Sequence, residues 1–258
     1  MTPANKRAVP AMTSLPRPLF SRHEALPPGS WTEEHCHPWC QLSYASSGVL
    51  GVRTAVGDYV APPHFAVWIP PDLSHQVVNR GRAEMRSLYI SAEAACALPT
   101  ECCVLEVSTL AAELIQRVGE LPVEYEQHGP AGRLVAVLLD ELAVLRRGGF
   151  RLPLPKDRRL VAICNALQES PADARSLSDW AGKVGASERT LARLFVRETG
   201  LGFGVWRQRL RLVLSLDALQ AGAGVTEVAM AHGYESPSAF IAAFRGVFGV
   251  TPGALRGG

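Results

Sequence analysis

The sequence predicts an α+β protein: a small β-barrel with flanking helices, then an all-α domain of two helix-turn-helix motifs joined by a linker helix. Its 258 residues are enough for two domains. The last hundred residues contain a repeated helical pattern. Residues 19–108 instead hold many prolines, glycines and short runs of alternating polar and apolar residues, which are typical of strands. Strands are therefore expected first and helices last.

The repeat pairs residues 177–195 with residues 225–244. The offset is 48 residues before the turn and 49 after it, so the second copy has one additional turn residue. Each copy predicts a helix, a tight turn that needs glycine, and a second helix. The matching pairs are Ala181 and Ala229, Gly185 and Gly233, Leu191 and Phe240, Phe195 and Phe244, and Gly200 and Gly249.

The second helix of each copy has an N-cap and a free outer face. Ser187 and Ser236 stand where an N-cap is expected, and Pro237 follows as a first-turn residue. Apolar residues recur at i, i+3 and i+4 and form the inner face. The outer face then holds Arg189, Ala192, Arg193 and Arg197 in the first copy, and Ser238, Ala239, Ala242 and Arg245 in the second.

A third helix is expected between the copies, over residues 203–220. At about 1.5 Å per residue it is roughly 27 Å long. Successive major-groove entries on one face of B-DNA lie about 34 Å apart. One chain can therefore place two helices in neighbouring turns of a duplex. The alternative is a bundle of helical hairpins with solvated arginines, which explains one copy better than two aligned copies.

Residues 156–258 resemble the DNA-binding domain of the AraC-type regulator family. The resemblance implies that six outer positions face bases, namely Arg189, Ala192, Arg193, Ser238, Ala239 and Ala242. It rests on the run 189–195, Glu198 to Gly200, Arg209 to Arg211, Val228, Ala229, Gly233, Tyr234, Ser238 to Phe240, Phe244, Phe248, Gly249, Thr251 and Pro252.

The two predicted recognition helices differ in what they offer to bases. Arg189 and Arg193 can each grip guanine through O6 and N7, worth about 1–3 kcal/mol of discrimination per good pair. The second helix offers one serine and two alanines. We expect the first helix to read sequence and the second to position the protein on phosphate.

The charge distribution agrees with a DNA-binding C-terminal end. Residues 156–258 carry net charge +4, and residues 1–155 carry −2. A mildly basic end favours double-stranded DNA as a partner. No apolar run approaches 18 residues, and the proline-rich start lacks the apolar core of a secretory signal, so we expect no membrane association. The six cysteines show no paired CxxC spacing, which favours reduced thiols in the cytoplasm.

The N-terminal strands are expected at residues 41–45, 48–54, 66–69 and 85–90, in a small barrel or jelly roll. Two spaced motifs resemble those of the cupin fold. The resemblance departs at Gln41, where cupins usually carry glutamate, and at Asp72, where they usually carry glycine. His64 also stands where the second motif would begin with glycine. The motifs are Gly29, His35, His37, Gln41 and Gly48, then Pro70 to Asp72, His75 and Asn79.

These motifs predict a metal site in a sensor domain. Residues of equal parity share a strand face, so His35, His37 and Gln41 should point one way, and His75 could join them. Such a set suits zinc, nickel, iron or copper. The expected effector pocket is lined by Trp39, Tyr44 and Trp68. Three alternatives stay open: histidines that only hydrogen-bond in an organic-ligand pocket, a bulge at Pro38 that turns Cys40 inward, and a redox role for Cys36, Cys40, Cys102 or Cys103.

The expected domain organisation is a disordered arm (1–18), a barrel (19–108), a helical dimerisation region (109–147), a linker (148–157) and the DNA-binding domain (158–258). One predicted helix has an apolar stripe that could either form a dimer interface or pack on the barrel. We favour a homodimer, because two-fold pairing would double the DNA footprint. That stripe is Leu134, Val135, Val137, Leu138, Leu142 and Leu145.

The predicted function is sequence-specific regulation of transcription at promoter DNA, controlled by a small molecule or metal, with contact to RNA polymerase if the protein activates. The alternative is a metal-dependent cupin enzyme fused to a DNA-binding domain. Only Glu33, Glu34 and Asp72 lie near the histidines in sequence, so no catalytic residue is assigned. A DNA-bending architectural protein is disfavoured because Arg189 and Arg193 suit base recognition.

Overall fold

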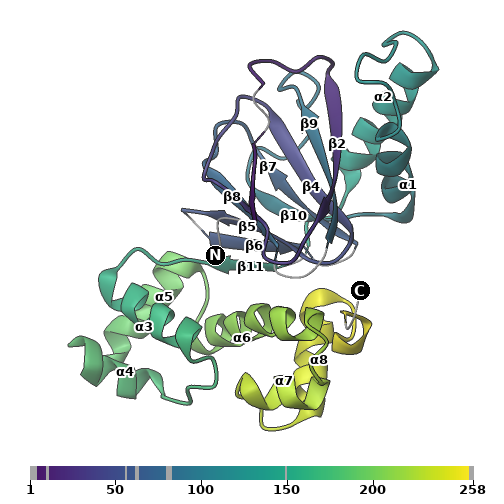
Figure 1. Ribbon diagram of the computed structural model, residues 1–258. Coiled ribbons are helices and arrows are strands. Elements are labelled where there is room, and N and C mark those ends of the chain that lie inside the picture. The colour runs from purple at the N-terminus through teal and green to yellow at the C-terminus, as the bar shows by residue number, and fades with distance from the viewer. Residues whose placement is uncertain are drawn as a thin grey trace. The chain divides into compact units, whose positions relative to one another are not determined.

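The computed structural model describes residues 5–9, 12–55, 57–61, 64–79, 83–148 and 150–255. The chain forms two compact units, one of Met1–Thr54 with Tyr59–Arg151 and one of Ala55–Asp58 with Leu152–Gly258. The first unit contains two helices and the sheets, apart from residues 57–58 and 152–153, and the second contains the remaining helices (Figure 1). The predicted α+β class, strands first and helices last, is confirmed.

Two sheets form the first unit. The five-stranded sheet is antiparallel, in the order β10 (Cys103–Glu106), β7 (Phe65–Ile69), β4 (Cys40–Ser47), β9 (Ala83–Ile90) and β2 (Leu19–Leu26). The six-stranded sheet has the order β1 (Lys6–Arg7), β3 (Trp31–Thr32), β8 (His75–Asn79), β5 (Leu50–Thr54), β6 (Gly57–Ala61) and β11 (Phe150–Pro153).

The strand period of two divides the core into two layers. Val52 of β5, Val67 of β7 and Met85 of β9 belong to the cluster between the sheets. Leu42 of β4 and Leu88 of β9 belong to a second cluster, on the other face of the five-stranded sheet. Adjacent residues of one strand therefore serve different layers, and this decides which side chains can line a barrel site.

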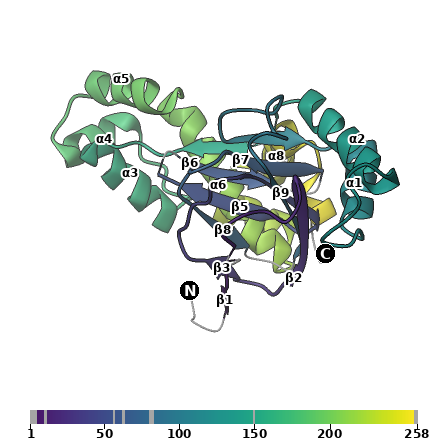
Figure 2. The same ribbon diagram turned by 90° about the horizontal axis from the view of Figure 1, so that it is seen from above.

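Helices α1 (Thr109–Val118) and α2 (Pro130–Val144) cover the outer layer and lie together along one side of the sheets in both views (Figures 1 and 2). Leu138 is fully buried in this layer, with Val135 and Leu142. Much of the apolar stripe predicted for α2 therefore packs against the barrel. Val137 and Val144 stay exposed, by 48% and 74%. Dimerisation through this helix remains a prediction.

Two segments expected to be irregular contain strands. Lys6 and Arg7, within the predicted disordered arm, pair in parallel with Trp31 and Thr32, and the guanidinium of Arg7 forms an ion pair with Glu24. Lys6 and Arg7 are thus ordered, in contrast to the predicted disordered arm, and residues 1–4, 10 and 11 of that arm lie outside the described residues. In the predicted linker, residues 150–153 form β11 because Phe150 and Leu152 alternate with exposed Arg151 and bury their side chains. The flanking glycines and prolines concealed this alternation.

The second unit is helical, as the repeat predicts. The 18-residue α6 joins the two helix-turn-helix motifs (Figure 1) and has the predicted bounds. No helix in the described ranges is both long and apolar enough to cross a membrane. The helices are α3 (Arg158–Glu169), α4 (Leu177–Val184), α5 (Glu188–Thr199), α6 (Phe203–Gln220), α7 (Val225–Ala231) and α8 (Pro237–Phe248), followed by a 3-10 turn at Pro252–Leu255.

A pair of neighbouring substitutions in α2 tests the outer layer. Leu138→Ala removes a fully buried side chain and should lower the free energy of unfolding by about 2–5 kcal/mol. Val137→Ala, one position earlier on the exposed side, should change it by less than about 0.5 kcal/mol. Urea denaturation followed by tryptophan fluorescence measures both. Equal losses in the two variants would contradict the assigned orientation of α2.

Candidate functional sites

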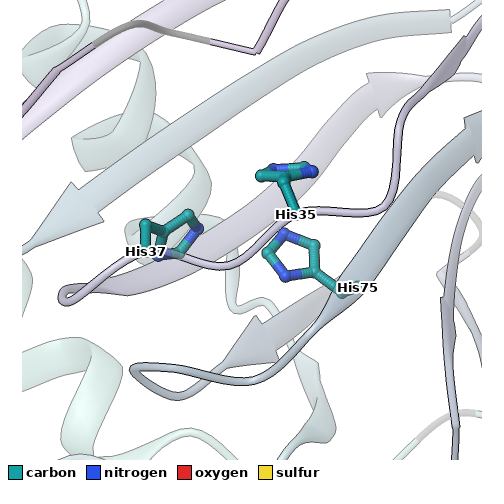
Figure 3. Close-up of side chains that lie close together, drawn as sticks. All are labelled: His35, His37 and His75. Atoms are coloured by element: carbon teal, nitrogen blue, oxygen red, sulfur yellow. The ribbon is translucent and has the colours of Figure 1, made fainter.

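Three histidines meet at one end of the barrel because two segments are bridged through their backbones. His35 N–H donates to the carbonyl of His75 at 3.0 Å, and His75 N–H returns a bond to the carbonyl of His35 at 2.9 Å. Asp72 N–H then donates to the carbonyl of His37 at 2.9 Å. The segment before β4 is thereby fixed against the start of β8, and Figure 3 shows the three rings gathered around one small space.

The three rings are close enough to share one ion. One ring nitrogen from each of His35, His37 and His75 lies within 4.8 Å of the others. Ring centroids are 4.3 Å apart for His35 and His75 and 5.1 Å for His37 and His75. Nitrogen ligands of a tetrahedral zinc stand about 3.4 Å apart. Small side-chain rotations are therefore enough to bring these nitrogens to a common metal.

Hydrogen bonds to the backbone orient all three imidazoles. The Nδ1 of His35, His37 and His75 lies 2.8 Å from the carbonyl oxygens of Glu33, Trp39 and Leu73, respectively. A carbonyl only accepts, so each Nδ1 carries a proton, and a ring in its neutral form then presents a lone pair at Nε2. Histidines that bind metals have this arrangement, in which a second hydrogen bond fixes the tautomer.

His75 has a buried ring nitrogen that forms no hydrogen bond within the described residues. The side chain is fully buried, and this nitrogen is Nε2. Burial, opposed by the bond to Leu73 and reinforced by His35 and His37, lowers the pKa of His75 to about 4. The ring is therefore neutral at physiological pH. A buried acceptor without a partner costs about 1–3 kcal/mol, which a bound cation would offset.

Gln41 lies beside the cluster, as the motif predicts. Its Oε1 is 2.9 Å from Nε2 of His37, and its Nε2 donates to the hydroxyls of Ser43, at 2.9 Å, and Ser87, at 3.4 Å. Since Nδ1 of His37 holds the ring proton, its Nε2 carries a lone pair. The Oε1 of Gln41 carries lone pairs as well, so two acceptor atoms are in contact. A cation between them satisfies both, and so does a rotated amide that donates to the ring.

The two departures from glycine in the second motif retain glycine-like backbones. His64 has φ of 71° and Asp72 has φ of 59°. Side chains with a Cβ seldom adopt this left-handed region. The backbone at both motif positions therefore follows the conformation that glycine would favour, despite the substituted side chains. At Asp72 this turn delivers the N–H that holds His37.

Of the three residues predicted to line an effector pocket, Trp39 lies at a cavity and Tyr44 and Trp68 lie away from it. Trp39 stacks on His37 at 5.3 Å and lines a cavity of about 80 Å³ beside the histidines. Tyr44 and Trp68 lie in the outer layer under α1 and α2, where the indole N–H of Trp68 donates to the carbonyl of Pro99 at 2.6 Å. Strand parity explains the position of Tyr44, because it faces away from the side of β4 that carries Gln41. The cavity is lined by Val9, Met12, His35, Cys36, His37, Pro38, Trp39 and Tyr89.

Five residues of this cavity were not assigned to the site from the sequence: Val9, Met12, Cys36, Pro38 and Tyr89. Val9 and Met12 come from the arm, and Tyr89 comes from β9. Only the pairing of distant segments brings them here. Tyr89 shares a strand face with Ser87, a residue that bonds to Gln41, so the alternation along β9 places it toward the site. No pattern in the sequence marks Val9 or Met12 as pocket residues.

The inward bulge that would make Cys40 a ligand does not occur. Cys40 lies in the outer layer, and burial raises the pKa of its thiol to about 11. A protonated thiol is a poor metal ligand. Cys36 is exposed and lines the cavity beside the histidines, because the chain between His35 and β4 is not a strand and does not alternate its side chains. All six cysteines are free thiols.

The second helices of the two repeats are capped as predicted. Ser187 accepts from Thr190 N–H at 3.1 Å, and Ser236 accepts from Ala239 N–H at 3.2 Å. Gly185 and Gly233 adopt φ of 67° and 75°, which allows the sharp turn before each helix. Every predicted outer position is exposed or half-buried, so the predicted DNA-binding set lies on accessible faces of α5 and α8.

The two faces differ in chemistry. Arg189 and Arg193 are exposed on α5, one helical turn apart. Arg197 follows on the same face, beside Glu198, with which it forms an ion pair at 3.1 Å. Val196, which the sequence reasoning passed over, is also 56% exposed there. The face of α8 presents Ser238, Ala239, Ala242 and Arg245.

Comparison with known families matches both units. Residues 17–143 match the model of the AraC-like ligand binding domain, and residues 180–258 match a helix-turn-helix domain. The HTH-type transcriptional regulator NimR of Escherichia coli is 36% identical over 219 residues, covering 85% of this chain and 80% of that protein. The HTH-type transcriptional regulator RipA of Corynebacterium glutamicum is 35% identical over 106 residues, covering 41% and 32%.

Among solved structures, ToxT of Vibrio cholerae is 10% identical, with a TM-score of 0.39 over 92% of this chain and 97% of that chain. The match to NimR spans most of both chains, and the two family models together span both units. This chain belongs to the AraC family of transcriptional regulators and combines an N-terminal ligand-binding domain with a C-terminal DNA-binding domain.

Proposed function

We propose that this regulator is controlled by a divalent metal held in the N-terminal domain, alone or with a small molecule bound to it. The observation that supports the proposal is the buried, unpartnered Nε2 of His75, facing two further imidazoles whose protons are tied up at Nδ1. Pocket histidines that only hydrogen-bond an organic ligand would not require three such lone pairs on one small space.

The donor set fits a transition metal. His35, His37 and His75 would supply nitrogen ligands and Gln41 an amide oxygen, a set suited to zinc, nickel, iron or copper. A bound divalent ion would supply a positive charge and an open coordination position. All four donors are neutral, so the ion would keep its charge and favour an anionic or lone-pair effector. Trp39 and Tyr89 would flank that effector in the adjoining cavity.

On the DNA side, α5 is proposed to recognise bases and α8 to position the protein on the backbone. Arg189 and Arg193 suit guanine, whereas Ala239 and Ala242 offer only methyl groups. Arg245 can contact phosphate. We further propose a homodimer at promoter DNA in the cytoplasm, which contacts RNA polymerase if it activates. The non-enzymatic assignment rests on the relatives, which are named as transcriptional regulators.

Metal content tests the sensor proposal. His75→Ala removes the most deeply buried donor and should abolish binding of zinc or nickel, because two imidazoles and an amide hold a metal far less tightly than three imidazoles do. His23→Ala is the matched control, since this exposed histidine pairs with Glu84 away from the cluster. Elemental analysis after dialysis against each metal should give one ion per chain for wild type and the control. Absence of metal from the wild-type protein would refute the proposal.

Base preference tests the division of labour between the helices. Arg193→Ala should relax preference at one base pair by about 1–3 kcal/mol and leave the other positions unchanged. Arg245→Ala should weaken binding to all sequences about equally and reduce the salt dependence by about one phosphate contact. Selection from a random duplex library, followed by affinity measurements, separates the two patterns. A uniform loss of affinity on Arg193→Ala would contradict the assignment.

A further inference from the structure

Arg211, on the linker helix α6, ties the two helix-turn-helix motifs together. Its guanidinium donates to the carbonyl of Gly233 at 2.8 Å, in the turn between α7 and α8. It also donates to the carbonyls of Pro171, at 2.8 Å, and Asp173, at 3.1 Å, in the loop before α4. One side chain therefore joins the turn of the second motif to the loop that leads into the first. Bonds from a charged group are worth about twice neutral ones.

Gly233 has a second role that its repeat partner lacks. Both Gly185 and Gly233 have positive φ, so both need glycine for the turn. A Cβ on Gly233 would also lie 2.7 Å from the guanidinium of Arg211 and 2.9 Å from the Cα of Ala172. A Cβ on Gly185 would meet nothing within 4 Å. The turn of the second motif is thus pressed directly against the loop of the first.

The loop that receives Arg211 is itself anchored. Arg207, one helical turn earlier on α6, donates to the carbonyl of Arg175 at 2.8 Å. Arg175 pairs with Asp173 and lies 3.9 Å above the ring of Trp180 in α4. The contact therefore reaches α4, which packs on α5. This gives the two motifs a second connection besides the covalent one through α6.

We propose that Arg211 and Gly233 set the relative orientation of α5 and α8, and so determine whether both helices can enter successive major grooves at once. Arg211 is a positioning residue, because its guanidinium bonds to backbone carbonyls of the second motif and of the loop before the first. A single helix bends and twists at its ends, whereas two connections between the motifs define their angle. Loss of the second connection should leave the angle between α5 and α8 variable, without altering how α5 recognises bases.

The test compares two duplexes. The base sequence preferred by the full-length chain is first selected from a random duplex library. The short duplex carries only that sequence, and the long duplex extends it by one helical turn on both sides. Wild type should bind the long duplex at least about tenfold more tightly, through added phosphate contacts. Arg211→Gln should reduce this ratio to about threefold or less, with affinity for the short duplex unchanged. Arg211→Lys should give an intermediate ratio, because lysine keeps the charge but lacks the forked donors of the guanidinium.

The two glycines supply the matched control. Gly233→Ala and Gly185→Ala introduce similar backbone strain, of about 1–2 kcal/mol, but only the first displaces Arg211. Gly233→Ala should lower the long-to-short ratio as Arg211→Gln does, and Gly185→Ala should leave it unchanged. A partly unfolded variant loses active protein on both duplexes alike, so the ratio still reports orientation.

Two results would overturn the proposal. One is an equal loss of affinity on both duplexes in the Arg211 variants, which would show that Arg211 serves only the stability of the domain. The other is a wild-type protein that does not distinguish the long from the short duplex, which would show that α8 does not engage the second groove. If Gly233→Ala fails to fold, Arg211→Gln and Arg211→Lys still decide between these results.

Discussion

The paired backbone bonds between His35 and His75 are the constraint on which the sensor domain depends. They hold the segment before β4 against the start of β8, although the two lie forty positions apart in the chain. Each nearby carbonyl then takes the Nδ1 proton of one imidazole. The backbone thus decides which nitrogen each ring presents, and burial keeps His75 neutral. Metal binding would complete an arrangement that the fold has already oriented.

The DNA-binding unit applies the same principle at a larger scale. Glycine lets the backbone turn sharply at both motifs, and Arg211 fixes one motif against the other through carbonyl groups. The side chains that face solvent on α5 and α8 are then free to differ. This separation explains how two copies of one motif, so similar in their cores, can present a guanidinium face and a nearly apolar one.

Sequence was sufficient wherever the determinant was local or periodic. The repeat located four helices and the turn glycines, and the spacing of His35, His37, Gln41 and His75 predicted a cluster that the structure brings together. Tyr44 was predicted to line the pocket, although it lies three residues from Gln41 in β4 and therefore on the opposite face. Trp68, Val9 and Met12 depend on which strands pair across the barrel, and no local pattern encodes that. Strand β11 was hidden because glycine and proline surround two alternating apolar residues.

We propose that occupancy of the histidine cluster controls DNA binding. The most direct test of this proposal is the affinity of the full-length protein for its selected duplex, measured with the metal loaded and after chelation. Coupling between two sites is typically about 1–3 kcal/mol, so the two affinities should differ by roughly 5–150-fold. The difference should vanish in His75→Ala, which cannot respond to the ion. Equal affinities in the loaded and metal-free wild-type protein, with metal shown to bind, would show that the cluster does not control DNA binding.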